Sequence, residues 1–199
     1  MTSYIAFLRG INVGGHKRVG MDGLRKAVEA LGFQNVETLL ASGNLLFTTR
    51  ATGGRALAAA IERRIQRRFG LEVSVILRTR HDLQKLLDAD PFKNIRVTPR
   101  ARLFVTFLSE KPRTTLKIPY QSPDKSFRIF RRIGRDLCSV LTLGPQWSKN
   151  LRQMDILEKE FGKKITTRSW STVRKCAARL RAAAPGKVKP GRMTEQGRA

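Results

Sequence analysis

The chain has 199 residues, 41% of them hydrophobic, and its 40 lysines and arginines outnumber 15 aspartates and glutamates to give a formal net charge of +25. This hydrophobic content excludes a globally disordered chain, and no apolar run approaches the ~20 residues of a membrane span. The opening stretch MTSYIAFLRG lacks the features of a signal peptide. Two cysteines, Cys138 and Cys176, are too few for a disulfide framework. We therefore expect a cytoplasmic protein.

The first half of the chain predicts the order β-α-β-β-α-β. Apolar residues recur every three or four positions in the helical segments, and glycine follows the first of them. Gly and Asn in the ASGN stretch, residues 41–44, suit a tight turn between two strands. The expected strands are 4–9, 36–40, 45–49 and 72–77, and the expected helices are 21–31 and 55–69.

A similar order follows in the second half, although the sequence itself does not repeat. The expected helices are 81–88 and 150–161, with a helical turn within 111–119; the expected strands are 101–108, 127–133, 137–143 and 163–167. Ser169 suits the N-cap of a last helix through residue 181. The fold class is therefore α+β, as two tandem ferredoxin-like (βαββαβ) plaits with an appended C-terminal helix. We expect a monomer with plaits at 1–90 and 91–183 and a disordered basic tail at 184–199.

A glycine-rich loop, RGINVGG at residues 9–15, leaves the first strand, and the SGN turn at 42–44 leaves the second. The two strands run parallel in a plait, so both loops should meet at one edge beside a helix start, which favours anions. The residues expected to line a phosphate or carboxylate site there are Arg9, Asn12, Gly14, Gly15, Lys17, Ser42 and Asn44. Neither nucleotide-binding glycine fingerprint is present. A glycine-rich corner that only holds the hairpin is the competing interpretation.

Two stretches carry a family resemblance. YIAFLRGINVGGHKRVGMDGLRKAVEALGFQNVETLLASGNLLF resembles the N-terminal signature of the bacterial family called domain of unknown function 1697, and FGKKITTRSWSTVRK is similar to its closing Thr-Arg-Asn-Trp motif. The resemblance spans residues 1–180 and implies small soluble proteins of two ferredoxin-like halves, without an implied catalytic residue or cofactor. Its C-terminal motif places Arg168 and Trp170 here, with Ser169 where the family usually has Asn.

The two residues of this motif have structural interpretations. Spacings of three and seven residues put Trp170 on the same helix face as Val173 and Ala177, which is the buried side. Arg168 is expected to bind a loop carbonyl.

Chemistry-bearing residues are sparse. His16, His81 and the two cysteines form no short-spaced pair, so we predict no metal site. Ser42 and His16 have no acid nearby to complete a triad. No convergent acid–base group is recognisable, so we assign no catalytic residue and no cofactor, and leave open whether the protein is an enzyme.

The positive charge is concentrated in the second half. Residues 91–181 hold 22 basic and 6 acidic residues, against 14 and 8 in residues 1–90. Such a field attracts polyanions. In the strand FRIFRRI, Arg128, Phe130 and Arg132 are expected to share a face that stacks bases and contacts phosphate. With Arg131, these residues form the predicted nucleic-acid site.

Several interpretations remain open at this point. Binding of RNA, DNA or another polyanion leads; a small-ligand binder or enzyme at the RGINVGG and SGN edge is the alternative. A structural or interaction protein whose charge is incidental is a third. Phe104 and Phe130 are surface residues in the first case, but two plaits that pack their open faces together would bury both.

Overall fold

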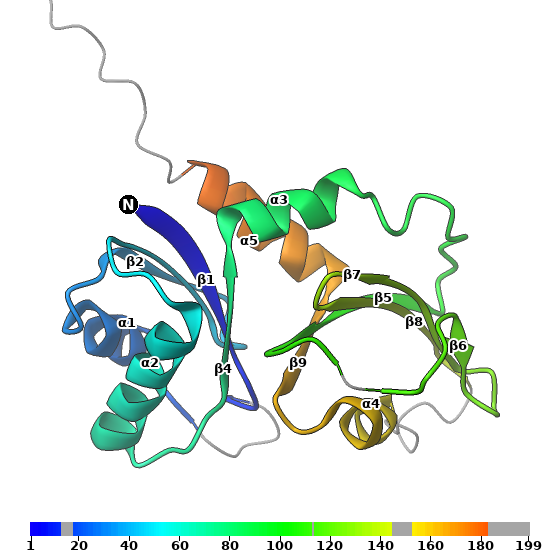
Figure 1. Ribbon diagram of the computed structural model, residues 1–199, viewed down its shortest axis with the longest axis horizontal. Coiled ribbons are helices and arrows are strands. Elements are labelled where there is room, and N and C mark those ends of the chain that lie inside the picture. The colour runs from blue at the N-terminus through cyan, green and yellow to red at the C-terminus, as the bar shows by residue number, and fades with distance from the viewer. Residues whose placement is uncertain (13–17, 113, 145–152, 183–199) are drawn as a thin grey trace, which may run out of the picture.

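The computed structural model describes residues 1–12, 18–112, 114–144 and 153–182. Within these residues the chain forms two antiparallel sheets and five helices, a mixed α+β fold (Figure 1). None of the helices in this described part has the length and apolar character needed to cross a bilayer.

The first sheet has the strand order β2-β3-β1-β4, with every neighbouring pair antiparallel. Its strands are β1 (Thr2–Leu8), β2 (Gln34–Leu39), β3 (Asn44–Thr49) and β4 (Val75–Thr79), and its helices are α1 (Met21–Glu29) and α2 (Gly54–Phe69). Side chains alternate along β1, so Tyr4, Ala6 and Leu8 join the core beneath α1 and α2. Both helices cover one face of the sheet (Figure 1).

The second sheet has the order β6-β7-β8-β5-β9 and is also antiparallel. Its strands are β5 (Ala101–Leu108), β6 (Tyr120–Gln121), β7 (Phe127–Ile133), β8 (Asp136–Thr142) and β9 (Ile165–Ser169), and the remaining helices are α3 (Arg80–Asp88), α4 (Gln153–Phe161) and α5 (Trp170–Ala182). Helix α4 covers one face of this sheet (Figure 1), where Phe127, Leu141 and Leu157 share a core.

The two sheets bury their remaining faces in one shared core. Ile5 and Phe7 of the first sheet and Val105 and Phe107 of the second all belong to it. The rings of Phe7 and Phe107 stack with centroids 4.1 Å apart. Helices α3 and α5 pack against each other beside this contact (Figure 1). The open sheet faces are therefore covered by each other and by these two helices.

Most predicted elements are present, with three differences. The strand expected at 72–77 begins only at Val75. No helix occurs in the described residues of 111–119, and the two-residue strand β6 follows instead. The last strand extends to Ser169, two residues beyond the expected KKITT stretch. The tail expected at 184–199 lies outside the described residues.

A β-bulge corrects the expected facing of the FRIFRRI strand. The register of β7 against β8 shifts between Ile129 and Arg131. Arg132 therefore pairs with Leu137, which belongs to the core on the α4 side, whereas Phe130 packs in the shared core between the sheets. The expectation that Arg128, Phe130 and Arg132 share one face is wrong, because the extra residue of the bulge interrupts the two-residue alternation.

Candidate functional site

The RGINVGG loop and the SGN turn lie side by side, as their place after parallel strands predicts. The Leu8 amide donates to the Gly43 carbonyl at 2.8 Å. The Asn12 side chain donates to the carbonyls of Val19 and Ala41, and its oxygen accepts from the Val19 amide. Asn12 thus closes its own loop and ties that loop to the neighbouring turn.

Arg168 of the second half completes this corner. It donates to the Leu8 carbonyl at 2.6 Å, to the Ser42 carbonyl at 2.9 Å and to Asn44 Oδ1 at 2.7 Å. Burial lowers the pKa of Arg168 to about 10, so its guanidinium is still charged at neutral pH. The expected carbonyl partner for Arg168 is therefore present, and it belongs to the two loops that carry the N-terminal signature.

Other polar side chains of the expected site are also engaged internally. Arg9 forms an ion pair with Glu158 and donates to the Lys163 carbonyl. Asn44 is fully buried and donates to the Leu39 carbonyl and to Ser42 Oγ. These contacts are what a structural corner requires. Gly14, Gly15, His16 and Lys17 lie outside the described residues.

A cavity of about 400 Å³ adjoins this corner, lined by Asn12, Arg18, Val19 and Gly20. Helix α1 begins here, and no side chain of the described residues caps the amides of its first turn. Arg18 is exposed and lies just before the start of this helix in the sequence. The combination supplies positive charge and free N–H groups, which is the chemistry expected for a small anion.

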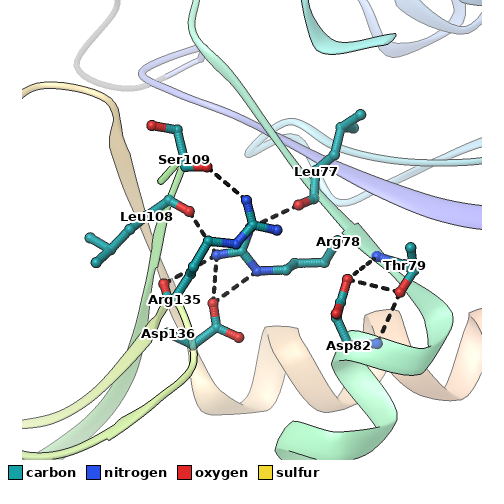
Figure 2. Close-up of polar contacts among 8 residues, drawn as sticks. All are labelled: Leu77, Arg78, Thr79, Asp82, Leu108, Ser109, Arg135 and Asp136. Atoms are coloured by element: carbon teal, nitrogen blue, oxygen red, sulfur yellow. Dashed lines mark hydrogen bonds and ion pairs between the residues drawn. The ribbon is translucent and has the colours of Figure 1, made fainter. Parts of the chain in front are cut away.

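A second buried arginine crosses between the halves in the opposite direction. Arg78 of β4 is 2% exposed, and its Nε and Nη2 donate to Asp136 Oδ1 at 2.9 and 2.6 Å. Figure 2 shows the same guanidinium pointing to the carbonyls of Leu108 and Arg135. Burial raises the pKa of the Asp136 carboxyl, and Arg78 opposes that rise. No pattern in the sequence predicts this pair; its one signal is an arginine inside the largely apolar stretch VILRT.

Ion pairs reveal where the positive charge is left uncompensated. Three carboxylates of the second half pair with arginines of the first half: Glu110 with Arg55, Asp136 with Arg78, and Glu158 with Arg9. Arg179 is paired with Glu37 of the first half. Within the described residues, no ion pair joins two members of the second half. Its cations therefore keep an excess that its own acids do not neutralise.

The predicted nucleic-acid residues lie on and beside the bulge of β7. Arg128, Arg131 and Arg132 are exposed. Arg131 donates to the Ala89 carbonyl at the end of α3. Phe130 is only partly exposed, and its ring meets the edge of Phe92 at a centroid distance of 5.4 Å. The arginines are thus available to a partner, whereas the aromatic ring belongs to the rim of the core.

Trp170 of the C-terminal motif and the two cysteines lie in the interior of the fold. Trp170 is 9% exposed and packs in the core shared by the sheets, with Phe92 at a centroid distance of 5.0 Å. Ser169 Oγ accepts from the Thr172 amide and caps α5 as expected. Cys138 and Cys176 are both fully buried in the same core. Among the residues that the structure describes, no cluster of three or more His, Cys, Asp or Glu side chains is placed to hold a metal ion.

Comparisons with known proteins add the family and the fold. Residues 1–137 match the profile of a protein family of unknown function, DUF1697. The chain is similar in structure to the conserved bacterial protein SP0830 from Streptococcus pneumoniae, with a TM-score of 0.68, 24% identity, and coverage of 90% of this chain and 98% of that one. No curated protein matches the sequence. The family match ends before the TTRSW motif, but it covers the RGINVGG loop, the SGN turn and most of both sheets. The chain therefore belongs to the DUF1697 family.

Proposed function

We propose that the protein binds a polyanion, RNA or DNA, through the exposed cations of its second half. The pattern of ion pairs carries this proposal. Three of the six acids in residues 91–181 are engaged by arginines of the first half, so the uncompensated charge of the second half is increased by the way the halves associate. A field of this kind attracts phosphates independently of sequence.

The mode of binding follows from where the aromatic rings lie. Every tyrosine, phenylalanine and tryptophan in the described part of the chain is buried or partly buried. Phe130 contacts Phe92, and Phe104 packs toward α4. Stacking of bases needs an exposed ring face. Contact is therefore proposed with the phosphate backbone, through Arg128, Arg131 and Arg132, without the stacking on Phe130 that the sequence left open.

The experiment compares two triple variants of identical net charge. One removes Arg128, Arg131 and Arg132 by substitution with Gln; the control removes Arg63, Arg67 and Arg68, which are exposed on α2 in the first half. Affinity for a labelled 20-mer is measured by fluorescence anisotropy over a range of salt concentrations. The slope of log affinity against log salt should become shallower by about 2–3 in the β7 variant, since each of the three phosphate contacts contributes about 0.7–0.9. The α2 variant should keep a slope near the original.

An equal loss of affinity in the two triple variants would mean that binding depends only on the net charge of the protein. The β7 arginines would then be removed from the proposal. No binding at low salt would overturn nucleic-acid binding altogether and favour a structural or interaction protein. Phe130→Leu should leave affinity within about twofold, because a packed ring does not stack on a base. A tenfold loss of affinity in Phe130→Leu would instead support stacking of a base on Phe130.

A second candidate function is binding of a small anion at the cavity beside α1. The cavity of about 400 Å³, the exposed Arg18 and the uncapped helix start support it. Titration with inorganic phosphate, followed by amide chemical shifts, should give saturable changes at Arg18, Val19 and Gly20. Arg18→Gln should abolish them. Chemical-shift changes spread over the arginines of α2 would instead show that phosphate is attracted by the overall positive charge and has no defined site at this cavity.

We also propose that each half is a ferredoxin-like plait, at 1–90 and 91–183, in a monomeric cytoplasmic protein. The order β2-β3-β1-β4 recurs as β7-β8-β5-β9 in the second sheet, which supports an equivalent arrangement. The second half lacks a helix in the described residues between β5 and β7, and this is its departure from a complete plait. Light scattering during gel filtration tests the monomer, for which a mass of 22.5 kDa is expected.

A further inference from the structure

Two buried side-chain polar atoms have no hydrogen-bond partner within the described residues, and both belong to the second half. They are Ser139 Oγ and Gln153 Oε1. Ser139 lies between Leu137 and Leu141 in β8, two residues from each, so it shares their face toward α4. Gln153 begins α4 and is 8% exposed. Unsatisfied buried groups are rare in native proteins and call for a partner.

A cavity of about 350 Å³ lies beside Gln153, which lines it. Its apolar walls come from the sheet and the helix: Tyr120, Phe127, Leu141 and Ile156. This volume falls at the lower end of small-molecule sites, which combine such walls with a few fixed polar groups. The cavity is remote in sequence from the RGINVGG corner and shares no lining residue with it.

The polar rim of this cavity contains two carboxylates, Asp124 and Asp155. Asp124 is held in the turn before β7, where Ser122 Oγ and Ser126 Oγ donate to it at 2.5 and 2.8 Å. These hydrogen bonds lower the pKa of Asp124, so it is an oriented anion. Among the described residues that line the cavity, one is a cation, the exposed Lys159. The described part of the rim is therefore net negative on a chain whose formal charge is +25.

From this geometry we propose that the cavity binds a small organic amine with an apolar body. The apolar part of the ligand would pack against the walls formed by Phe127 and Ile156, and its ammonium group would lie at the carboxylate rim. Gln153 lines the cavity, and its side chain would turn so that the buried Oε1 accepts a hydrogen bond from an N–H group of the ligand, which supplies the missing partner. Ligands of the same shape that carry a carboxylate in place of the ammonium group are disfavoured, because they would lie against the carboxylates of the rim.

The test uses three probes of nearly equal size: phenethylamine, 2-phenylethanol and phenylacetate. Titrations are followed by NMR on the full chain, with the amides of residues 120–127 and 153–159 and the Gln153 side-chain amide as reporters. Phenethylamine should bind about tenfold more tightly than 2-phenylethanol, and phenylacetate should bind most weakly. The overall charge of the protein favours the opposite order, so the predicted order reports on the cavity itself. Equal or tighter binding of phenylacetate would overturn the proposal.

Variants distinguish this cavity from other acidic surface. Gln153→Leu and Asp155→Asn should each weaken phenethylamine about tenfold, the loss expected for one hydrogen bond or charge contact. Glu160→Gln makes the same charge change on α4 outside the cavity lining and serves as the control. Gln153→Leu removes an unsatisfied acceptor, so the variant should remain folded. Undiminished amine binding in Gln153→Leu, or an equal effect of Glu160→Gln, would refute the site.

Discussion

Arg78 and Arg168 occupy equivalent positions in the two sheets. Arg78 of β4 pairs across the ladder with Ile5 of β1, and Arg168 of β9 pairs with Val105 of β5. Each guanidinium extends into the opposite half and donates to backbone carbonyls there. The two arginines therefore hold the halves together reciprocally.

The two aromatic rings in contact between the sheets also occupy equivalent positions in the two halves. Phe7 lies two residues beyond Ile5, and Phe107 lies two residues beyond Val105. The Arg78 guanidinium lies 5.4 Å from the Phe107 ring centre, and that of Arg168 lies 5.7 Å from the Phe7 ring centre. The stacked rings are thus enclosed by one cation from each half, an arrangement that contributes beyond the area buried.

The helix that follows each arginine begins in the same way. Thr79 Oγ1 accepts from the amide of Asp82, and Ser169 Oγ accepts from the amide of Thr172, three residues on in both cases. Helices α3 and α5 then pack together. Strand, arginine, hydroxyl cap and helix form one local motif used twice, although the surrounding sequence does not repeat.

Removing Arg78 should be severely destabilising. Arg78→Met leaves Asp136 buried without its cation, and we expect the free energy of unfolding to fall by about 3–5 kcal/mol in urea titrations. Replacing both residues, as Arg78→Met with Asp136→Leu, should recover much of that loss. The exposed pair Arg55–Glu110 is the control, and Arg55→Ala should cost less than about 1 kcal/mol. A double variant no more stable than Arg78→Met would contradict a buried-charge origin.

Arg168 should not be replaceable by lysine. Lysine keeps the charge but lacks the planar fork that reaches the Leu8 and Ser42 carbonyls together. We expect Arg168→Lys to lower the free energy of unfolding by about 2–4 kcal/mol, since buried acceptors are left unpaired. Arg174→Lys, on the exposed side of α5, should change it by less than about 0.5 kcal/mol. Similar values for the two variants would argue against the corner contact.

Two glycines of the corner should respond differently to alanine. Both have positive φ, 68° at Gly10 and 76° at Gly43, so each substitution incurs about 1–2 kcal/mol of backbone strain. A Cβ on Gly43 would also lie 2.7 Å from Ile11 Cδ1, whereas no atom of the described residues lies within 4 Å of one on Gly10. Gly43→Ala should therefore lower the melting temperature clearly more than Gly10→Ala does. Equal shifts would show that the corner yields to the added methyl group.

Trp170→Ala should behave as a core truncation. The indole packs against Phe92 and Val173 in the core between the sheets, so we expect a loss of about 3–5 kcal/mol in urea unfolding. Polyanion affinity of the folded variant should be unchanged. A small stability change accompanied by lost binding would instead identify Trp170 as a ligand-contacting residue.

The buried thiols predict a decline in stability at alkaline pH. Burial raises the pKa of Cys138 and Cys176 from 9.0 to about 12, so the unfolded chain loses these protons first as pH increases. Stability due to the protonated thiols is thus complete below pH 9 and is lost between pH 9 and 12. Between pH 8 and 10 the two thiols together should account for about 2–3 kcal/mol. Comparison of urea unfolding with the double variant Cys138→Ala, Cys176→Ala isolates this contribution; identical pH profiles would contradict it.

Local signals in the sequence were sufficient for most of the element order. The four-residue spacing of Leu57, Ile61 and Ile65 predicted α2, whose buried residues are these three. Ser169 is predictable as a cap because its hydroxyl acts on an amide only three residues away. The parallel direction of β1 and β2 followed from the crossover rule, which placed the two loops at one edge. These inferences depend on interactions between residues close in the chain or on general rules of chain connection.

The functional interpretation of β7 depended on information that the sequence does not carry. The alternation in FRIFRRI predicts one face for Arg128, Phe130 and Arg132, but the bulge divides them, and only the pairing with β8 reveals it. Likewise, the sequence allows the Phe130 ring to lie either on the surface or in the core, and only its contact with Phe92 in the structure decides between them.

By itself, the sequence determined the α+β class, most helices and strands, the family resemblance and the excess of positive charge. The tertiary structure decided how that charge is distributed in space and which polar residues remain available. Arg168 satisfies carbonyls more than 120 residues away, and Arg78 reaches an aspartate at a sequence separation of 58. A backbone carbonyl is the same group in every residue, so nothing in the sequence marks it as the partner of a distant arginine. Only the packing of the two sheets brings donor and acceptor together.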